Sequence, residues 1–139
     1  MNKSIELVYN WLHTAGMQFN DRSQVDLAIS LIQEEFDELK KGIEDKNKDE
    51  ILDSFGDLFF TILNAQYFLG SKQEELVHKF EQIVKSNYSK FCKTREEAVE
   101  SAEAYIKGNH SNKMNQQIPA KYVSTGNPEY PYVVLRADT

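Results

Sequence analysis

Apolar residues recur three or four positions apart through most of residues 1–108, which is the spacing of one face of an α-helix. Proline is absent until Pro119, so long helices can run without interruption. Glycines and polar caps separate the periodic segments. The pattern predicts a first helix over residues 3–15, a second from a cap at Asp21 or Ser23 to about Lys41, and a third over about 49–69. A fourth helix begins at a capping box formed by Ser71 and Glu74 and runs to about Phe91. A fifth begins at a capping box formed by Thr94 and Glu97 and ends before Gly108.

The segment after Gly108 has a different composition. Residues 109–129 are rich in Asn, Gln, Ser and Pro, which is typical of an extended arm. The stretch YPYVVLR at 130–136 is β-prone and predicts a short strand or a docked tail. We therefore expect an all-α fold, with a four- to five-helix bundle at residues 1–108 and an extended C-terminal arm at residues 109–139.

The stretch LIQEEFDELKKG, residues 31–42, carries acids on more than one side of its predicted helix. At about 100° per residue, Glu35 falls inside the arc of apolar residues and Glu38 falls between two leucines. Glu34 lies at the edge of that arc, and Asp37 lies on the solvent side. The helix geometry therefore predicts that Glu35 and Glu38 point into the bundle.

The next predicted helix, residues 49–69, is apolar over most of its circumference, which is typical of a helix buried on nearly all sides. Its polar residues Glu50, Asp53, Asp57 and Asn64 nevertheless share one strip about 60° wide. The apolar circumference exceeds what the other helices of one chain can cover. We therefore expect a homo-oligomer, either a dimer or a dimer of dimers, with apolar residues from Phe55 to Phe68 near the interface.

Burying several carboxylates together is unfavourable unless something compensates their charge. Neither helix places Lys or Arg on these strips, and the ligand atoms are all oxygen, which suits Mg²⁺ or Mn²⁺. The alternative is that the acids lie on helix faces that touch only water.

Composition narrows the class of protein further. The formal net charge of −6 disfavours binding to nucleic acid or to anionic membranes. One cysteine, Cys92, fits a reducing compartment, and the N-terminus has no apolar run of signal-peptide length, so we expect a cytoplasmic protein. Because a divalent cation reverses the local charge, an acidic site can still accept an anionic substrate.

The acids also match a family pattern. Glu34-Glu35-x-x-Glu38, then eleven residues, then Glu50-x-x-Asp53 resembles the EExxE…ExxD pattern of the all-α NTP pyrophosphohydrolases, which include MazG-like enzymes, dimeric dUTPases and phosphoribosyl-ATP pyrophosphohydrolase. The resemblance implies hydrolysis of a nucleoside triphosphate between the α and β phosphates. It implies that Glu35, Glu38, Glu50 and Asp53 hold Mg²⁺, and that Glu34 ligates or orients the attacking water.

The resemblance also implies substrate contacts. SNYSKF, residues 86–91, is similar to a family segment in which an Asn and a basic residue contact phosphates, here Asn87 and Lys90. Asp57 falls where family members contact the sugar. Base-pocket residues vary among subfamilies, and the candidates before the first acidic helix are Trp11, His13, Phe19 and Asn20. The base and the sugar that are accepted remain open.

Two other functions fit parts of the sequence. A carboxylate-bridged di-iron bundle needs two Glu-x-x-His motifs, and this chain has one, Glu75 to His78. A non-catalytic nucleotide-binding or helical interaction module would carry the same acids without turnover. Release of pyrophosphate distinguishes the second alternative from the enzyme.

Overall fold

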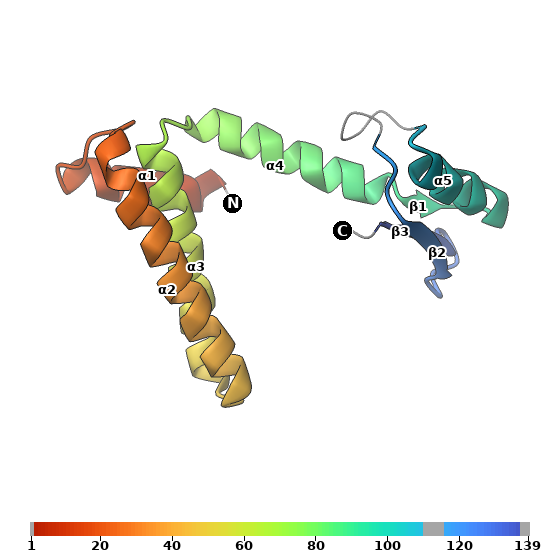
Figure 1. The fold of residues 1–139 in the computed structure, drawn as a ribbon, viewed down its shortest axis with the longest axis horizontal. Helices are drawn as coiled ribbons and strands as arrows, with labels where there is room; N and C mark the ends of the chain where they lie inside the picture. Colours follow the sequence, from red (N-terminus) through yellow and green to blue (C-terminus); the bar gives the residue numbers. More distant parts are fainter. Residues whose placement is uncertain (1, 110–115, 137–139) are drawn as a thin grey trace. The chain divides into compact units, whose positions relative to one another are not determined.

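A computed structural model describes residues 2–109 and 116–136 of the chain (Figure 1). The chain divides into two compact units, Met1–Lys79 and Phe80–Thr139. Helix α4 (Gln73–Tyr88) begins in the first unit and ends in the second. The boundary between domains that was expected from the sequence lies later, after Gly108, where the composition changes.

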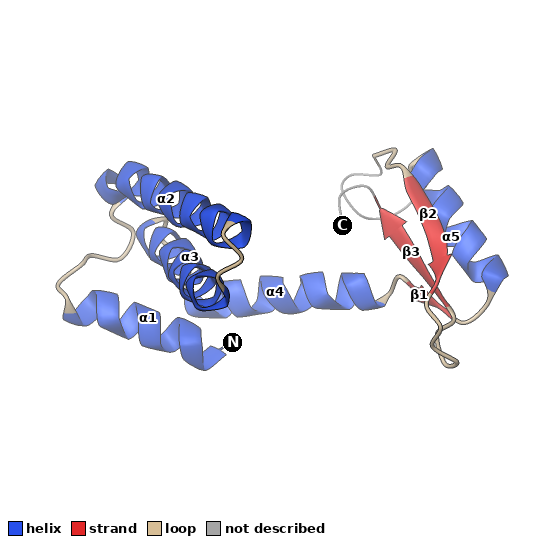
Figure 2. Cartoon of the chain, turned by 90° about the horizontal axis from the view of Figure 1, so that it is seen from below, coloured by secondary structure: helices blue, strands red, loops and turns tan. Residues whose placement is uncertain are grey.

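The first unit is helical, as the sequence predicted. It contains α1 (Asn2–Thr14), a short 3-10 helix η1 (Arg22–Gln24), α2 (Val25–Glu44) and α3 (Lys48–Phe68). Helices α2 and α3 pack along one another as an antiparallel hairpin (Figures 1 and 2). Asp21 is a cap, but of η1 and not of the longer helix as predicted: its carboxylate accepts from the Ser23 backbone N–H at 3.1 Å, and α2 begins after Gln24 without a side-chain cap.

Helix α2 does not stop at Gly42, where the sequence predicted its end. Gly42 is buried, and a Cβ atom there would lie 3.4 Å from Ile51 Cγ1 and from the Ile51 backbone nitrogen. These are ordinary van der Waals distances, so Gly42 lies in the packing contact between α2 and α3 near their turn. Helix α2 therefore continues to Glu44, and Gly42 is a packing residue and not a terminator.

The core of the first unit lies between α1 and the C-terminal half of α3. Its buried residues are Ile5, Tyr9, Leu12, Ala28, Leu63, Ala65, Tyr67 and Phe68. In the range 55–68, where an interface was expected, Leu63, Ala65, Tyr67 and Phe68 are buried within their own chain, and the homo-oligomer stays a prediction. The apolar residues of α3 that remain exposed are Leu52, Phe55 and Ile62.

Tyr9 links this core to the segment before α4. Its hydroxyl donates to the Ser71 carbonyl at 2.7 Å, and burial, with smaller contributions from Glu75 and Tyr67, raises the pKa of Tyr9 from 10.0 to about 12. A raised pKa means that the neutral phenol stabilises the fold below about pH 10. This contribution is lost as the pH rises through about 12.

Replacing Tyr9 by phenylalanine should lower the free energy of unfolding by about 1 kcal/mol at pH 8, because the Ser71 carbonyl loses its donor. It should also flatten the loss of stability between about pH 10 and 12. Urea denaturation at pH 8 and pH 11 measures both effects. Tyr88→Phe is the matched control because Tyr88 is 70% exposed. If the control and Tyr9→Phe behaved alike, the role of the buried phenol would be refuted.

The second unit contains β1 (Phe91–Cys92), α5 (Arg95–Lys107), β2 (Ala120–Ser124) and β3 (Tyr132–Arg136). The strands form an antiparallel sheet in the order β1-β3-β2, and α5 packs against it (Figure 2). Residues buried between helix and sheet include Cys92, Ala98, Ala102, Tyr105, Ile118 and Val134.

The prediction of an all-α bundle is therefore correct only for the helical majority of the fold. The β-prone stretch at 130–136 does form a strand, but residues 120–124 form a second strand where an extended arm was predicted. The fourth helix ends at Tyr88, before the predicted Phe91, because Phe91 pairs with Val133 and the Lys90 carbonyl accepts from the Val134 N–H at 3.0 Å.

The two predicted capping boxes have different outcomes. Thr94 caps α5 as predicted, since its hydroxyl accepts from the Glu97 N–H at 3.1 Å. At the start of α4 the predicted pair is wrong. There the Lys72 N–H donates to Glu75 Oε2 at 3.1 Å, and the Ser71 hydroxyl donates to Gln66 instead.

Candidate functional site

Glu35 is the acid of α2 that the structure places closest to the interior, as the helix geometry predicted. The residue is half-buried, and its Oε2 atom is buried without a hydrogen-bond partner in the described part of the chain. Glu34, Asp37 and Glu38 are exposed. The expectation that Glu38 also points inward is therefore not met within one chain, because Leu27 beside it is itself 57% exposed.

Burial raises the pKa of Glu35 above its ordinary value, and neighbouring carboxylates raise it further. In order of effect these neighbours are Glu38, Asp57 and Glu34, and Glu38 also hydrogen-bonds the protonated form. No lysine or arginine among the described residues forms an ion pair with any of these four acids. The site is thus a half-buried acid in a negative environment, without a cationic side chain to compensate it.

The packing of the α2–α3 hairpin explains why Asp57 is the acid of α3 that acts on Glu35. Gly42 lies against the backbone of Glu50 and Ile51, which fixes the register of the two antiparallel helices. Moving seven residues back along α2 leads to Glu35, and moving seven residues forward from Glu50 leads to Asp57. Glu50 is therefore displaced from Glu35 by about 10 Å along the helix axis, which is seven residues at about 1.5 Å each.

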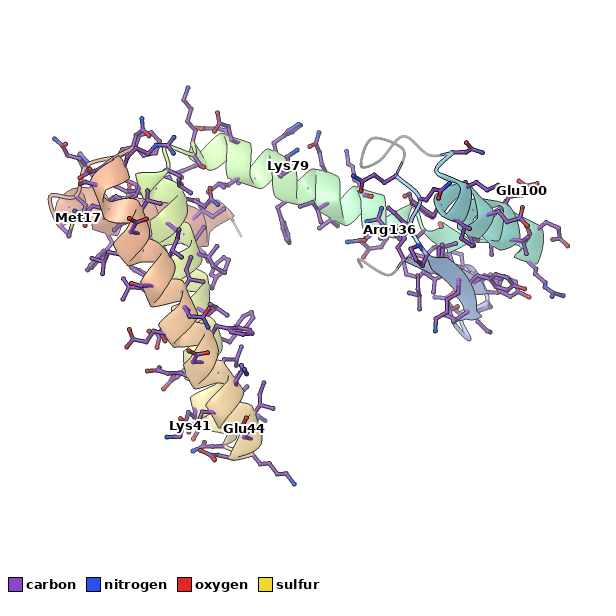
Figure 3. All side chains as sticks on the ribbon, viewed as in Figure 1. Met17, Lys41, Glu44, Lys79, Glu100 and Arg136 are labelled. Atoms are coloured by element: carbon purple, nitrogen blue, oxygen red, sulfur yellow. The ribbon has the colours of Figure 1, made fainter. Side chains whose placement is uncertain are left out.

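This register spreads the four predicted metal ligands along the hairpin. In this register Asp57 lies at the level of Glu35 and the exposed Asp53 lies near the level of Glu38, whereas Glu50 is half-buried near the α2–α3 turn. In the parts of the chain that are described, no three Asp, Glu, His or Cys side chains are grouped closely enough to hold a metal ion. Lys41 and Glu44 lie in the last turn of α2, at the end of the hairpin (Figure 3).

The donor chemistry of the site nonetheless suits a hard cation. The donors are carboxylate oxygens, and the unpartnered Oε2 of Glu35 is the kind of buried acceptor that a cation would satisfy. Glu38 and Asp57 are exposed, so their side chains can change rotamer at a small cost in free energy. Glu38 and Asp57, which act most strongly on Glu35, are therefore the candidate co-ligands, and a change of rotamer would be needed to bring the three carboxylates together.

The predicted phosphate contacts Asn87 and Lys90 lie in the second unit. Lys90 is only 4% exposed, and its Nζ donates to Asn87 Oδ1 at 2.7 Å. The three-residue spacing that suggested phosphate binding therefore brings the two side chains together at the end of α4. Their hydrogen bond gives the pair a structural role within the second unit.

The candidate base-pocket residues have different environments. His13 and Phe19 line one open pocket of about 540 Å³ together with Gly16, Met17, Gln18 and Tyr67. The pocket loop is fixed to α3, since the Tyr67 hydroxyl donates to the Met17 carbonyl at 2.7 Å. Trp11 instead packs edge-on against Phe60 at 5.6 Å. Asn20 donates its backbone N–H to the Tyr67 carbonyl at 3.0 Å.

Sequence reasoning assigned Asp57 to a sugar contact, and the structure places it beside Glu35. The strip shared by Glu50, Asp53 and Asp57 was visible in the sequence, but the level at which it meets Glu35 was not. The single Glu-x-x-His motif remains isolated. His78 is exposed, and Glu75 is engaged by the Lys72 N–H.

No helix in the described ranges 2–109 and 116–136 is long and apolar enough to cross a membrane. Comparisons with models of protein families, with curated proteins and with solved structures found no match to this chain.

Proposed function

We propose that the protein is a Mg²⁺-dependent nucleoside triphosphate pyrophosphohydrolase that cleaves between the α and β phosphates. The observation that carries the proposal is the buried, unpartnered Oε2 of Glu35 among Glu38, Asp57 and Glu34. Burial and three exposed neighbouring carboxylates all disfavour the ionised form of Glu35, and a perturbed acid of this kind supports a functional role. The resemblance of the EExxE…ExxD pattern supports the same reaction.

In this proposal Glu35, Glu38 and Asp57 hold Mg²⁺, and Glu50 and Asp53 provide further carboxylates nearer the α2–α3 turn. A bound Mg²⁺ ion supplies positive charge toward the triphosphate and acidifies coordinated water. Glu34 is exposed beside this set, and its carboxylate accepts a proton from the attacking water or orients it. The half-buried Glu35 stays fixed by its packing, which preserves the geometry of the set.

The pocket lined by His13, Phe19 and Tyr67 is the candidate base site of the proposed enzyme. Phe19, which is 43% exposed, offers aromatic surface to a base, and His13 and Gln18 offer hydrogen-bonding groups.

A panel of canonical and modified dNTPs and NTPs, assayed for pyrophosphate with Mg²⁺ or with EDTA, tests this function. We expect release of pyrophosphate and the nucleoside monophosphate from at least one triphosphate, only when Mg²⁺ is present. Release of orthophosphate would refute the bond assignment. Tight binding of nucleotides without any product would favour the alternative, a non-catalytic nucleotide-binding module.

We also propose that the protein forms a homodimer through the α2–α3 hairpin. On α2 the residues Ile29, Phe36 and Ile43 recur every seven positions, and each is 45–57% exposed. On α3 the exposed large apolar residues are Leu52, Phe55 and Ile62. Two such apolar stripes on one hairpin favour burial against another copy.

Phe55→Asp should shift the species in analytical ultracentrifugation from about twice the chain mass to 16.1 kDa, because Phe55 is 64% exposed on the proposed interface. Tyr88→Asp removes an exposed aromatic residue of the second unit and should leave the assembly unchanged. A parent protein that sediments as a monomer at micromolar concentration would refute the dimer.

A further inference from the structure

The face of the C-terminal sheet that α5 does not cover has a distinctive composition. In the strand register, Phe91 lies opposite Val133, Val133 lies opposite Val123, and Leu135 lies opposite Lys121. Residues paired across antiparallel strands point to the same face of the sheet. The alternate residues, including Cys92, Tyr122, Tyr132 and Val134, pack against α5. The first set therefore forms the opposite face, which we call the open sheet face.

A row of aromatic rings extends from the open sheet face. The ring centroids of Tyr88 and Phe91 are 6.0 Å apart, and those of Phe91 and Tyr130 are also 6.0 Å apart. Tyr88 is 70% exposed and Phe91 is 39% exposed. Lys93 places its Nζ 5.9 Å from the centre of the Tyr130 ring. The row thus offers accessible aromatic surface with a cation at one end.

The charges of the second unit are arranged around this face. None of the three strands contains an acid, whereas α5, on the other side of the sheet, carries the exposed Glu96, Glu97, Glu100 and Glu103, of which Glu100 is labelled in Figure 3. Lys121 lies on the open sheet face, and Lys93 lies at its aromatic row. Glu129, in the loop before Tyr130, is the nearest acid in sequence to the row.

The net charge of the whole chain does not show how charge is divided between the two units. Residues 1–79 contain 15 acidic and 8 basic side chains, whereas residues 80–139 contain 7 acidic and 8 basic side chains. The formal charge is therefore −7 in the first unit and +1 in the second, and the total of −6, which predicted no binding to nucleic acid, does not describe the second unit. Local charge, and not the total, determines which surface attracts a polyanion.

We propose that the open sheet face binds single-stranded nucleic acid. Bases stack on Tyr88, Phe91 and Tyr130, and phosphates contact Lys93 and Lys121. Exposed aromatic rings with flanking cations are the combination that single-stranded nucleic acid requires, because each base has a face that can stack and each linkage carries one charge. A proline-rich peptide would use the rings without a need for the lysines, so the lysines favour nucleic acid.

The test is fluorescence anisotropy of a labelled 12-nucleotide oligo(dT) or oligo(U) with the full chain, in EDTA and 50 mM salt. EDTA makes the result independent of the proposed hydrolysis. Tyr88→Ala should weaken binding at least about fivefold, because stacking of one base is lost. Lys93→Ala combined with Lys121→Ala should reduce the slope of log affinity against log salt by about 1.4, at about 0.7 for each phosphate contact.

Two controls make the test specific. Lys107→Ala removes the same charge from α5, where Lys107 pairs with Glu103 at 3.6 Å, and it should leave affinity nearly unchanged. An abasic oligonucleotide of equal length should bind more weakly than oligo(dT). No binding by the parent, equal binding of the abasic strand, an equal effect of Lys107→Ala, or displacement of the oligonucleotide by a proline-rich peptide at lower concentration would overturn the proposal. Circular dichroism of each variant verifies that the second unit is folded.

Discussion

Glu35→Gln should decrease pyrophosphate release by about 10²-fold or more and, in the same protein, raise the stability of the metal-free fold. Glutamine keeps the shape of the side chain but removes the charge that would hold Mg²⁺, so activity falls. In the absence of metal, Glu38, Asp57 and Glu34 no longer repel a charge at this position. A structural ion pair would behave in the opposite way, because the loss of one partner destabilises the other.

The stability difference between the parent and Glu35→Gln should depend on pH. The pKa of Glu35 is raised in the fold, so its contribution to stability is present below the ordinary value of 4.5 and is lost as the pH rises through the raised pKa. In EDTA, the parent should therefore become less stable relative to Glu35→Gln as the pH rises toward 7. The two unfolding curves should converge at low pH, where Glu35 is protonated and resembles glutamine.

Thermal unfolding of the parent and Glu35→Gln between about pH 4 and 8, with EDTA or Mg²⁺, measures this difference. Mg²⁺ should raise the melting temperature of the parent and have a smaller effect on the variant. Asp37→Asn is the matched control because Asp37 is exposed on the same helix and its partner is Gln33, at 3.0 Å. A fully active Glu35→Gln protein, or one strongly destabilised in EDTA, would contradict the assigned role.

Gly70→Ala should be the most destabilising glycine substitution in the first unit, with a loss of about 2–4 kcal/mol in the free energy of unfolding. Gly70 has φ +80°, which a residue with a Cβ adopts at a cost of about 1–2 kcal/mol. The new Cβ would also lie 2.6 Å from Asn20 Oδ1 and 2.7 Å from Asn20 Cγ. Asn20 would have to move, which would weaken the hydrogen bond from its backbone N–H to the Tyr67 carbonyl.

Two other glycines separate these contributions. Gly16 has φ +81°, but no atom lies within 4 Å of the position that a Cβ would take, so Gly16→Ala should show the cost of the backbone alone. Gly56 lies inside α3 with open space around it, so Gly56→Ala should stabilise by about 0.5–1 kcal/mol. In urea denaturation, Gly70→Ala should lose the most stability, Gly16→Ala should lose less, and Gly56→Ala should gain stability. Equal losses at Gly16 and Gly70 would show that the contact with Asn20 does not contribute.

The helices of the first unit were predictable because their signals are local. The three- and four-residue spacing of apolar side chains located α1, α2 and α3 within a few residues of their bounds. The cap at Thr94 was likewise visible, since it depends on residues three apart. The inward position of Glu35 also followed from its angle on one helix.

The sheet was less predictable because its pairs are distant in the sequence. Phe91 pairs with Val133 across 42 positions, and a two-residue strand such as β1 has no periodicity of its own. Residues 120–124 have a clear partner only once β3 is in place. Strand formation there depends on tertiary pairing, which the composition of the segment did not reveal.

The sequence by itself determined the helical character of residues 2–88 and 95–107, the acids on two successive helices and the inward aim of Glu35, because each depends on side chains within a few turns of one another. Only the tertiary structure decided which acid of α3 meets Glu35, because the packing contact at Gly42 sets the register of the hairpin and brings Asp57, and not Glu50, to its level. It also decided that Phe91 and Lys121 share the open sheet face, because strand pairing aligns side chains that the chain order separates.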